Sequence, residues 1–267
     1  SKGEKPNRKR MAAVAALYAI APNIRSSEQV LGVDSEQALV KRPRPENKRV
    51  WASLEKGMSE VVKDLFDEAD KRDPLRASKW VIVLDGNNDQ LKDVKRELRR
   101  RKIKATIIVD VVHVFEYLWK AAWAFFDEGD PDAEEWVRVR ALEILRGNAP
   151  LVAAGMRRSA TLRELSEKAR KPVDTCARYL LKRKHYLRYD QALATGFPIA
   201  SGVIEGTCRH LINDRMDITG ARWGLEGAEA VLRLRALWAS GDLDEYWKFH
   251  VAEEHDRTYG TDYALAA

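Results

Sequence analysis

Cysteine is scarce in this 267-residue chain, which contains only Cys176 and Cys208. The two cysteines form no Cys-x-x-Cys pair and have no local histidine pattern, so the sequence favours neither a disulfide scaffold nor a zinc site. Apolar runs of the roughly 18–20 residues that cross a bilayer are also missing, as is a signal-peptide pattern. These absences predict a cytoplasmic protein in a reducing setting, without a membrane partner.

The excess of one charge sign is small, but the charges are distributed unevenly. The net charge is +6, from 47 basic and 41 acidic residues. Residues 92–104 hold eight bases and two acids, residues 157–188 hold eleven bases and three acids, and residues 127–135 hold six acids and no base. Any one cluster alone is typical of a solvated helix face. Several basic clusters together favour a polyanionic partner, and nucleic acid is the best candidate.

Two short apolar runs, each ending in an aspartate, give the clearest architectural signal. They are WVIVLD at 80–85 and ATIIVD at 105–110, and the residues between them have helical character over 88–102. This order predicts a βαβ unit with buried parallel strands. Functional residues in such sheets collect at the carboxyl ends of the strands, where Asp85 and Asp110 stand.

The rest of the chain predicts one more strand and many helices. MAAVAALYAI at 11–20 suits a buried strand, although its alanines are also compatible with a helix. Residues 26–47 are typical of a loop, and 51–71 has the spacing of an amphipathic helix. After His113 helical periodicity dominates, with late helices expected near 203–215, 225–238 and 243–254. The predicted fold is therefore α/β, with a helical insertion and a helix that returns to the core.

Asp85 and Glu205 are the candidate catalytic carboxylates. Gly86 lets the backbone turn away after Asp85 and leaves its carboxylate exposed; capping the next helix is the alternative role, which Asn87 can also take. The apolar neighbours of Glu205 predict a partly buried helix start that lies against the sheet. Two carboxylates brought together repel each other unless a cation such as Mg²⁺ (or Mn²⁺) relieves the repulsion. Two such ions at a scissile phosphate promote phosphodiester hydrolysis or transfer.

Several longer segments together resemble a known family. They are VLDGNNDQL, IIVDVVHVFEYLWKAAW, RKPVDTC, PIASGVIEGTCRHLINDRMDITGARWGLEGAEAVLRLRAL and DLDEYWKFH. Over nearly the whole chain they are similar to bacterial insertion-sequence DDE transposases, and most of all to the Kra-type group, relatives of the Mutator-like transposases. The resemblance implies a ribonuclease H-like core with a helical insertion, three Mg²⁺-binding carboxylates, nicking at transposon ends and attack of the freed 3′-hydroxyl on target DNA.

The same resemblance implies partners and residue roles. It implies double-stranded DNA, as transposon ends and target, a homo-oligomer when active, and a nucleoid-associated location in the bacterial cytoplasm. By motif, Asp85 is similar to the second catalytic carboxylate and Glu205 to the third. Asp110 and His113 fall where relatives carry a Cys-x-x-His or Asp-x-x-His pair. For Asp110, a supporting role and direct metal ligation both stay open. For His113, three roles stay open: orienting a carboxylate, touching DNA, or simple packing.

The first catalytic aspartate of such a core is expected in a strand upstream of residues 11–20. Asp34, in loop-like sequence, is a weak substitute. We therefore expect a carboxyl-terminal part of a transposase, with a partial core at 1–112, a helical insertion at 113–200 and the returning helix and C-terminal helices at 201–267. We also expect this chain to lack strand-transfer activity by itself.

Basic and aromatic residues follow Glu205 and are the candidate DNA-binding side chains. They are Arg209, His210, Arg215, Arg222 and Trp223. Arginines there can position phosphates without reading sequence, and a tryptophan can stack on a base. The alternatives are an ion pair of Arg215 with Asp214 or Asp217, and simple packing of Trp223.

Two other functions stay open at this point. One is a catalytically dead DNA-binding or assembly remnant of a transposase, which keeps the basic surfaces. The other is an unrelated α/β phosphohydrolase built on VLDGN, which is weaker because haloacid-dehalogenase-type enzymes need Asp-x-Asp and Asn87 occupies the second position.

Overall fold

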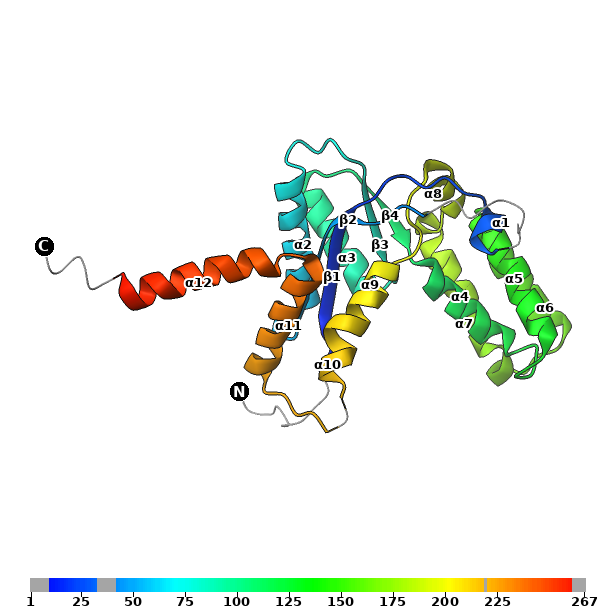
Figure 1. Cartoon of the computed structure of the whole chain (residues 1–267). Helices are drawn as coiled ribbons and strands as arrows, with labels where there is room; N and C mark the ends of the chain where they lie inside the picture. The colour runs from blue at the N-terminus through cyan, green and yellow to red at the C-terminus, as the bar shows by residue number, and fades with distance from the viewer. Residues whose placement is uncertain (1–9, 33–41, 219, 261–267) are drawn as a thin grey trace, which may run out of the picture. The chain divides into compact units, whose positions relative to one another are not determined.

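The computed structural model describes residues 10–32, 42–218 and 220–260, drawn in Figure 1. It confirms the mixed α/β class. The elements in chain order are β1 (Ala13–Ala19), α1 (Ser27–Val30), β2 (Glu46–Ser53), α2 (Met58–Arg72), β3 (Trp80–Leu84), α3 (Asn88–Arg101), β4 (Ala105–Val109), α4 (Val111–Ala122), α5 (Pro131–Leu145), α6 (Ala149–Leu162), α7 (Glu167–Arg183), the 3-10 helix η1 (Lys184–Tyr186), α8 (Tyr189–Thr195), α9 (Gly202–Thr207), the π-helix η2 (Cys208–Asn213), α10 (Asp214–Met216), α11 (Leu225–Ser240) and α12 (Leu243–Tyr259).

The described residues divide into two compact units. We name the first the hairpin unit; it comprises Ser1–Ala19, Pro45–Leu75 and Gly202–Ala267. We name the second the parallel-sheet unit; it comprises Ile20–Arg44 and Arg76–Ser201. The change of unit after Ser201 lies next to the predicted boundary after residue 200, and the predicted division into 1–112, 113–200 and 201–267 stays a prediction. Among the described residues, β3 and β4 belong to the same unit as the helices of 113–200, and β1 belongs to the other unit.

The hairpin unit is built on the antiparallel pair β1 and β2, in which Ala13 faces Ser53 and Leu17 faces Arg49. Alternate residues of a strand point to opposite faces. Val50 and Ala52 therefore pack on one face, in a cluster with Leu211 of η2 and with Leu232 and Ala236 of α11. On the other face Ala13, Ala15 and Val61 of α2 form a second cluster. Helices thus cover both faces of the hairpin.

Strand β2 is the main element that sequence patterns did not predict. The helix expected from Trp51 begins at Met58, after Trp51 has contributed to β2. Tertiary packing decides this, since Val50 and Ala52 are buried against α11 in the alternating pattern of a strand. The expected loop at 26–47 contains the short helix α1, capped by Ser26. Asp34 lies outside the described residues.

The parallel-sheet unit confirms the predicted βαβ motif. β3 and β4 pair in parallel from Trp80 opposite Ala105 to Leu84 opposite Val109, and α3 connects them. Helices α4 to α8 follow, as expected for the insertion, and bury Leu118, Met156 and Leu180 among themselves. None of the helices within the described ranges combines the length and apolar character that a bilayer crossing requires.

Candidate functional site

Asp85 directly follows β3, at the carboxyl end where it was predicted, and its side chain is half-exposed. Its Oδ1 accepts a hydrogen bond from the backbone N–H of Asn87 at 2.8 Å. The cap of α3 is Asn87, whose Oδ1 accepts from the N–H of Asp89 at 2.8 Å. Asp85 is therefore not used as the helix cap, and within the described ranges its second carboxylate oxygen accepts no hydrogen bond.

The turn after Asp85 is held by two side chains of α7. The hydroxyl of Tyr179 donates to the carbonyl of Asp85 at 3.0 Å, and Nε of Arg183 donates to the carbonyl of Gly86 at 2.6 Å. Gly86 has a φ of +80°, and a Cβ there would lie 2.8 Å from Nε of Arg183 and 2.9 Å from the Tyr179 hydroxyl. Only glycine fits this close approach. No local pattern in the sequence indicated these contacts.

Tyr179 is itself fixed in place. Its ring stacks on that of Tyr117 with centroids 4.0 Å apart, and the Arg183 guanidinium lies 4.3 Å above its centroid. Burial raises the pKa of the Tyr179 hydroxyl, an effect that the nearby positive charge of Arg183 opposes. The hydroxyl therefore stays protonated at neutral pH and can donate to the Asp85 carbonyl. The stacked rings of Tyr117 and Tyr179 and the guanidinium of Arg183 thus support the turn that follows Asp85.

Asp110 directly follows β4 and is buried, with only 1% of its surface exposed. Its Oδ1 caps α4 by accepting from the N–H of Val112 at 2.8 Å. Its Oδ2 accepts from the N–H of Ser201 at 2.8 Å and from the Ser201 hydroxyl. Both oxygens are thus occupied by protein donors. This geometry favours the supporting role of Asp110 over direct metal ligation, and it fixes the residue that precedes α9.

His113 lies in the first turn of α4 with a partly exposed side chain. Its Nδ1 is 3.2 Å from Oε2 of Glu116, one turn further along the same helix. Of the three roles that the sequence left open for His113, the described residues show a contact with one carboxylate, that of Glu116.

Glu205 stands in the first turn of α9, in the hairpin unit. Helix α9 contacts β1, and Val203 packs against the core cluster that contains Val50. The predicted contact of this helix with a sheet is found with the antiparallel pair β1 and β2. The carboxylate itself is exposed rather than partly buried. Desolvation raises the pKa of the Cys208 thiol, and the nearby negative charge of Glu205 adds to that shift.

Of the four basic candidates that follow Glu205, three form no ion pair with the residues that the structure describes. His210 is the exception and pairs with Asp214, with Nδ1 and Oδ2 3.0 Å apart. The expected alternative ion pair of Arg215 with Asp214 or Asp217 does not form among the described residues. Trp223 is 39% exposed, so its side chain is partly packed and partly open to solvent. Three arginines are exposed and make no ion pair with any residue in the described part of the chain: Arg209, Arg215 and Arg222.

A π-helix interrupts the helix that carries these residues. The wide turn η2 follows α9 and leads into α10. From α11, Nε of Arg235 donates to the carbonyl of Leu211 at 3.2 Å, and its Nη2 donates to the carbonyl of His210. Single π turns are rare and occur often at functional sites. Helical periodicity in the sequence does not indicate such a turn.

The two candidate carboxylates belong to different units, Asp85 to the parallel-sheet unit and Glu205 to the hairpin unit. Oxygen donors of this kind suit Mg²⁺. Within the described ranges, no three His, Cys, Asp or Glu side chains gather into a group that could hold a metal ion. No protein-family model, curated protein or solved structure matches this chain.

Proposed function

We propose that this chain is a catalytic region of a DDE-type DNA transposase and that Asp85 and Glu205 are two of its metal-binding carboxylates. The observation that carries the proposal is the environment of Asp85. A half-exposed carboxylate follows a parallel strand, keeps one oxygen without a hydrogen bond from the described residues, and sits on a turn held by Tyr179 and Arg183. A metal-binding carboxylate needs such a fixed backbone and an available oxygen.

The order of the elements supports the same proposal. An antiparallel hairpin is followed by α2, then by the parallel pair β3 and β4 joined by α3, then by helices α4 to α8 and finally by α9 with Glu205. This is the order that follows the first strand in the ribonuclease H-like core implied by the sequence resemblance. The long insertion falls between the strand that ends before Asp110 and the helix that carries Glu205, as that resemblance implies.

The proposed roles divide between metal and phosphate. Asp85 and Glu205 would each offer carboxylate oxygens to Mg²⁺, and the bound ion would activate the attacking oxygen and stabilise the leaving one. Arg209, Arg215 and Arg222 neutralise backbone phosphates, because their charges are exposed and not paired within the described part of the chain. Trp223 offers an exposed ring for stacking on a base. The role of Asp110 is to fix Ser201 next to α9.

Binding of duplex DNA tests the arginine assignment. We expect the wild-type chain to bind, with an affinity that falls with salt. Replacing Arg209, Arg215 and Arg222 together by alanine should lower the salt slope by about 0.9 for each phosphate that is no longer neutralised. Arg257→Ala is the matched control, since Arg257 is exposed but paired with Glu254. Absence of binding, or equal effects of the triple variant and the control, contradicts the assignment.

Binding of Mn²⁺, followed by its electron paramagnetic resonance signal, tests the carboxylates. Asp85→Asn and Glu205→Gln should each weaken Mn²⁺ binding, whereas Asp89→Asn, an exposed acid in the first turn of α3, should not. If the chain binds DNA and neither Asp85→Asn nor Glu205→Gln changes its binding of Mn²⁺, the result instead favours the catalytically dead DNA-binding remnant. That outcome rejects the catalytic proposal and leaves the arginine assignment intact.

A further inference from the structure

Two arginines of the parallel-sheet unit lie over one cluster of aromatic rings. The cluster consists of Phe125, Phe126 and Trp136, with the Trp136 ring centroid 5.3 Å from that of Phe125 and 6.3 Å from that of Phe126. Cζ of Arg140, on α5, lies 3.7 Å from the Trp136 centroid. Cζ of Arg163, which directly follows α6, lies 5.2 Å from the Phe125 centroid. Cation–π contacts thus hold both guanidinium groups on the same cluster, and we name these two residues the arginine pair.

Neither member of the arginine pair forms an ion pair with a residue that the structure describes. Nη1 of Arg140 donates to the carbonyl of Trp136, in its own helix, at 2.9 Å. Nη1 of Arg163 donates to the carbonyl of Phe125 at 3.3 Å. Nε and Nη2 of Arg140 donate to no described residue and remain open to solvent. The pair therefore keeps hydrogen-bond donors that the described part of the chain does not use.

The two positive charges of the pair also act on each other. Arg140 is half-buried, and its loss of hydration, together with the nearby charge of Arg163, lowers the pKa of Arg140 to about 10. Both guanidinium groups still carry their charge at neutral pH. Charges that are partly removed from water are normally paired with an opposite charge. A pair of like charges without such a partner among the described residues therefore favours the binding of an anion.

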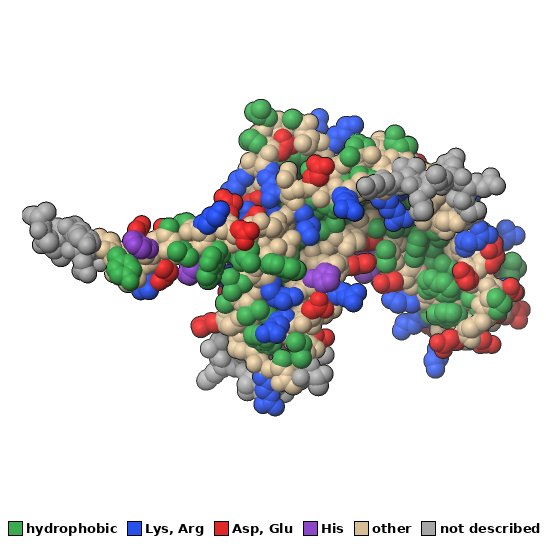
Figure 2. Space-filling model, viewed as in Figure 1, with side chains coloured by type: hydrophobic (Ala, Val, Ile, Leu, Met, Phe, Trp, Pro, Cys, Tyr) green, Lys and Arg blue, Asp and Glu red, His purple; other side chains and the backbone are tan. Residues whose placement is uncertain are grey.

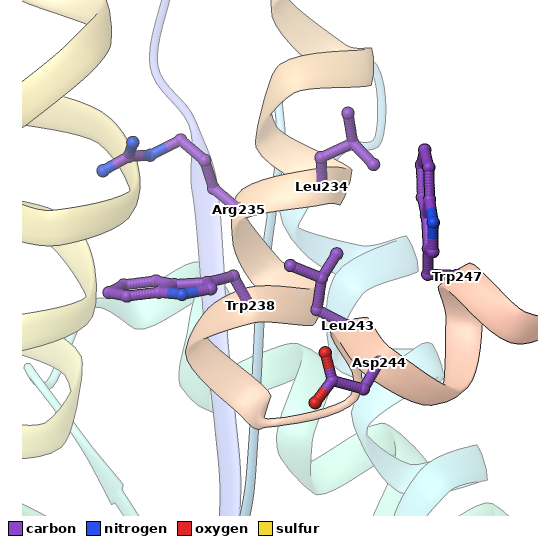
Figure 3. Close-up of a pocket in the computed structure, with 6 residues that line it drawn as sticks. All are labelled: Leu234, Arg235, Trp238, Leu243, Asp244 and Trp247. Atoms are coloured by element: carbon purple, nitrogen blue, oxygen red, sulfur yellow. The ribbon is translucent and has the colours of Figure 1, made fainter.

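The groove between α11 and α12 in the hairpin unit provides a contrast. It has a volume of about 440 Å³, and Figure 3 shows the six side chains that line it. The basic one among them is Arg235, whose guanidinium already donates to the carbonyls of Leu211 and His210. An acid, Asp244, stands in the same lining. The groove therefore offers an anion much less than the arginine pair does.

We propose that Arg140 and Arg163 bind a dianionic phosphate group, such as that of a phosphate monoester. The planar fork of donors on a guanidinium group matches the spacing of phosphate oxygens. A phosphate monoester carries about −1.5 to −2 charges at neutral pH, which compensates both arginines. The phosphodiester of a nucleic-acid backbone carries a single charge and compensates one of them.

The charges that follow the aromatic cluster in the chain also favour a small ligand over nucleic acid. Residues 127–135, directly after Phe126, hold six acids and no base. Figure 2 shows acidic side chains over the helices of this part of the unit. A nucleic-acid chain extends well beyond one phosphate, so such an acidic segment repels it. A small phosphate compound contacts little besides the pair and avoids most of this repulsion.

Side-chain NMR of the full chain, with inorganic phosphate as the probe, tests the site. At constant ionic strength and above the second pKa of phosphate, the Nε–H signals of Arg140 and Arg163 should shift and saturate, with a dissociation constant of about 0.1 to 10 mM. Arg163→Gln and Arg140→Lys, each followed at the remaining arginine, should weaken binding at least about fivefold. Arg138→Gln is the matched control and should leave binding unchanged, because Arg138 lies on the same helix but is paired with Glu135.

Dimethyl phosphate, a singly charged phosphodiester, and a short DNA duplex distinguish the two sources of phosphate. Dimethyl phosphate should bind at least about fivefold more weakly than inorganic phosphate, and the duplex should leave both signals in place. The proposal is overturned if dimethyl phosphate binds equally well, if the duplex shifts both signals, or if sodium chloride reproduces the effect of phosphate. Equal weakening by Arg163→Gln and Arg138→Gln, in variants with wild-type circular dichroism, also overturns it. None of these outcomes affects the proposed chemistry at Asp85 and Glu205, which is measured with Mn²⁺.

Discussion

Asp85 and Asp110 form a natural comparison within the parallel-sheet unit. Each follows an apolar strand, and the two strands are neighbours in one sheet. Asp85 is half-exposed and accepts one hydrogen bond through its carboxylate. Asp110 is buried and accepts three, from Val112 and from the backbone and hydroxyl of Ser201. The end of a parallel strand therefore determines where a carboxylate lies, but its neighbours determine whether it can bind a ligand.

The residue that follows each aspartate explains the difference. Gly86 takes a positive φ and turns the chain away, so Asp85 is left at the surface. Val111 instead begins α4 at once, so Asp110 becomes the N-cap of that helix. The backbone N–H of Ser201, far along the chain, then donates to the second oxygen of the Asp110 carboxylate.

The largest loss of stability is expected for Asp110→Ala, a variant that tests the difference between the two aspartates. The variant loses the cap of α4 and leaves the half-buried donors of Ser201 without their acceptor, which should lower the free energy of unfolding by about 3 kcal/mol. Asp85→Asn is the control, because asparagine keeps the acceptor for the N–H of Asn87, and its effect should stay within about 0.5 kcal/mol. Urea unfolding measures both. Equal losses for the two variants would break the comparison.

A smaller loss is expected for Gly86→Ala. The positive φ and the close approach of Arg183 and Tyr179 together should cost about 2 kcal/mol. Gly129→Ala separates the two contributions, since Gly129 also has a positive φ but nothing lies within 4 Å of its added Cβ. Urea unfolding of both variants should show the larger loss at Gly86. A loss no larger than that of Gly129→Ala would mean that α7 does not constrain the turn.

The smallest loss of stability is expected when the hydrogen bond from Tyr179 to the backbone of Asp85 is removed. Tyr179→Phe removes the hydrogen bond to the Asp85 carbonyl and should cost about 1 kcal/mol at neutral pH. Burial raises the pKa of Tyr179 above its ordinary value of 10.0. The unfolded chain therefore loses this proton first, and the stability that it contributes is full below about pH 10 and lost as pH rises beyond it.

Unfolding in urea between about pH 7 and pH 11 measures this dependence. Burial also raises the pKa of Tyr189 and raises the pKa of Cys176 to about 12, so the wild-type chain should lose stability in the alkaline range through several groups. Tyr179→Phe should reduce that alkaline loss of stability by the contribution of the Tyr179 hydroxyl. An alkaline dependence identical to that of the wild type would show that Tyr179 ionises as easily in the folded chain as in the unfolded one.

Much of the fold was predictable because its signals are local. WVIVL and ATIIV are continuous apolar runs bounded by an aspartate, and each became a strand at the predicted place. The segment ENKRVWAS carries no such signal, since most of its residues are polar or charged. It becomes β2 only through pairing with β1 and burial of Val50 and Ala52 against α11, which lies far along the chain.

The sequence predicts which carboxylates form the candidate site, and their catalytic role stays a prediction; it does not predict the side chains that hold Asp85 in place. Asp85 and Glu205 were identified from motifs and spacing. The contacts that hold Asp85 come from Tyr179 and Arg183, which are 94 and 97 residues away from the carbonyls they bind. A tyrosine and an arginine on a basic helix give no sign of such contacts. They follow from the packing of α7 and cannot be derived from local periodicity.

The π-helix η2 has a consequence for changes in chain length. An i→i+5 turn holds one residue more than an α-helical turn, so such a segment can lose a residue and close into ordinary α-helix. A one-residue deletion within Cys208–Asn213 should therefore leave α9 and α10 in their present rotational relation, whereas the same deletion inside α11 would rotate the two sides of the cut by about 100° against each other. The helix that carries Glu205 thus has a built-in tolerance for one deletion.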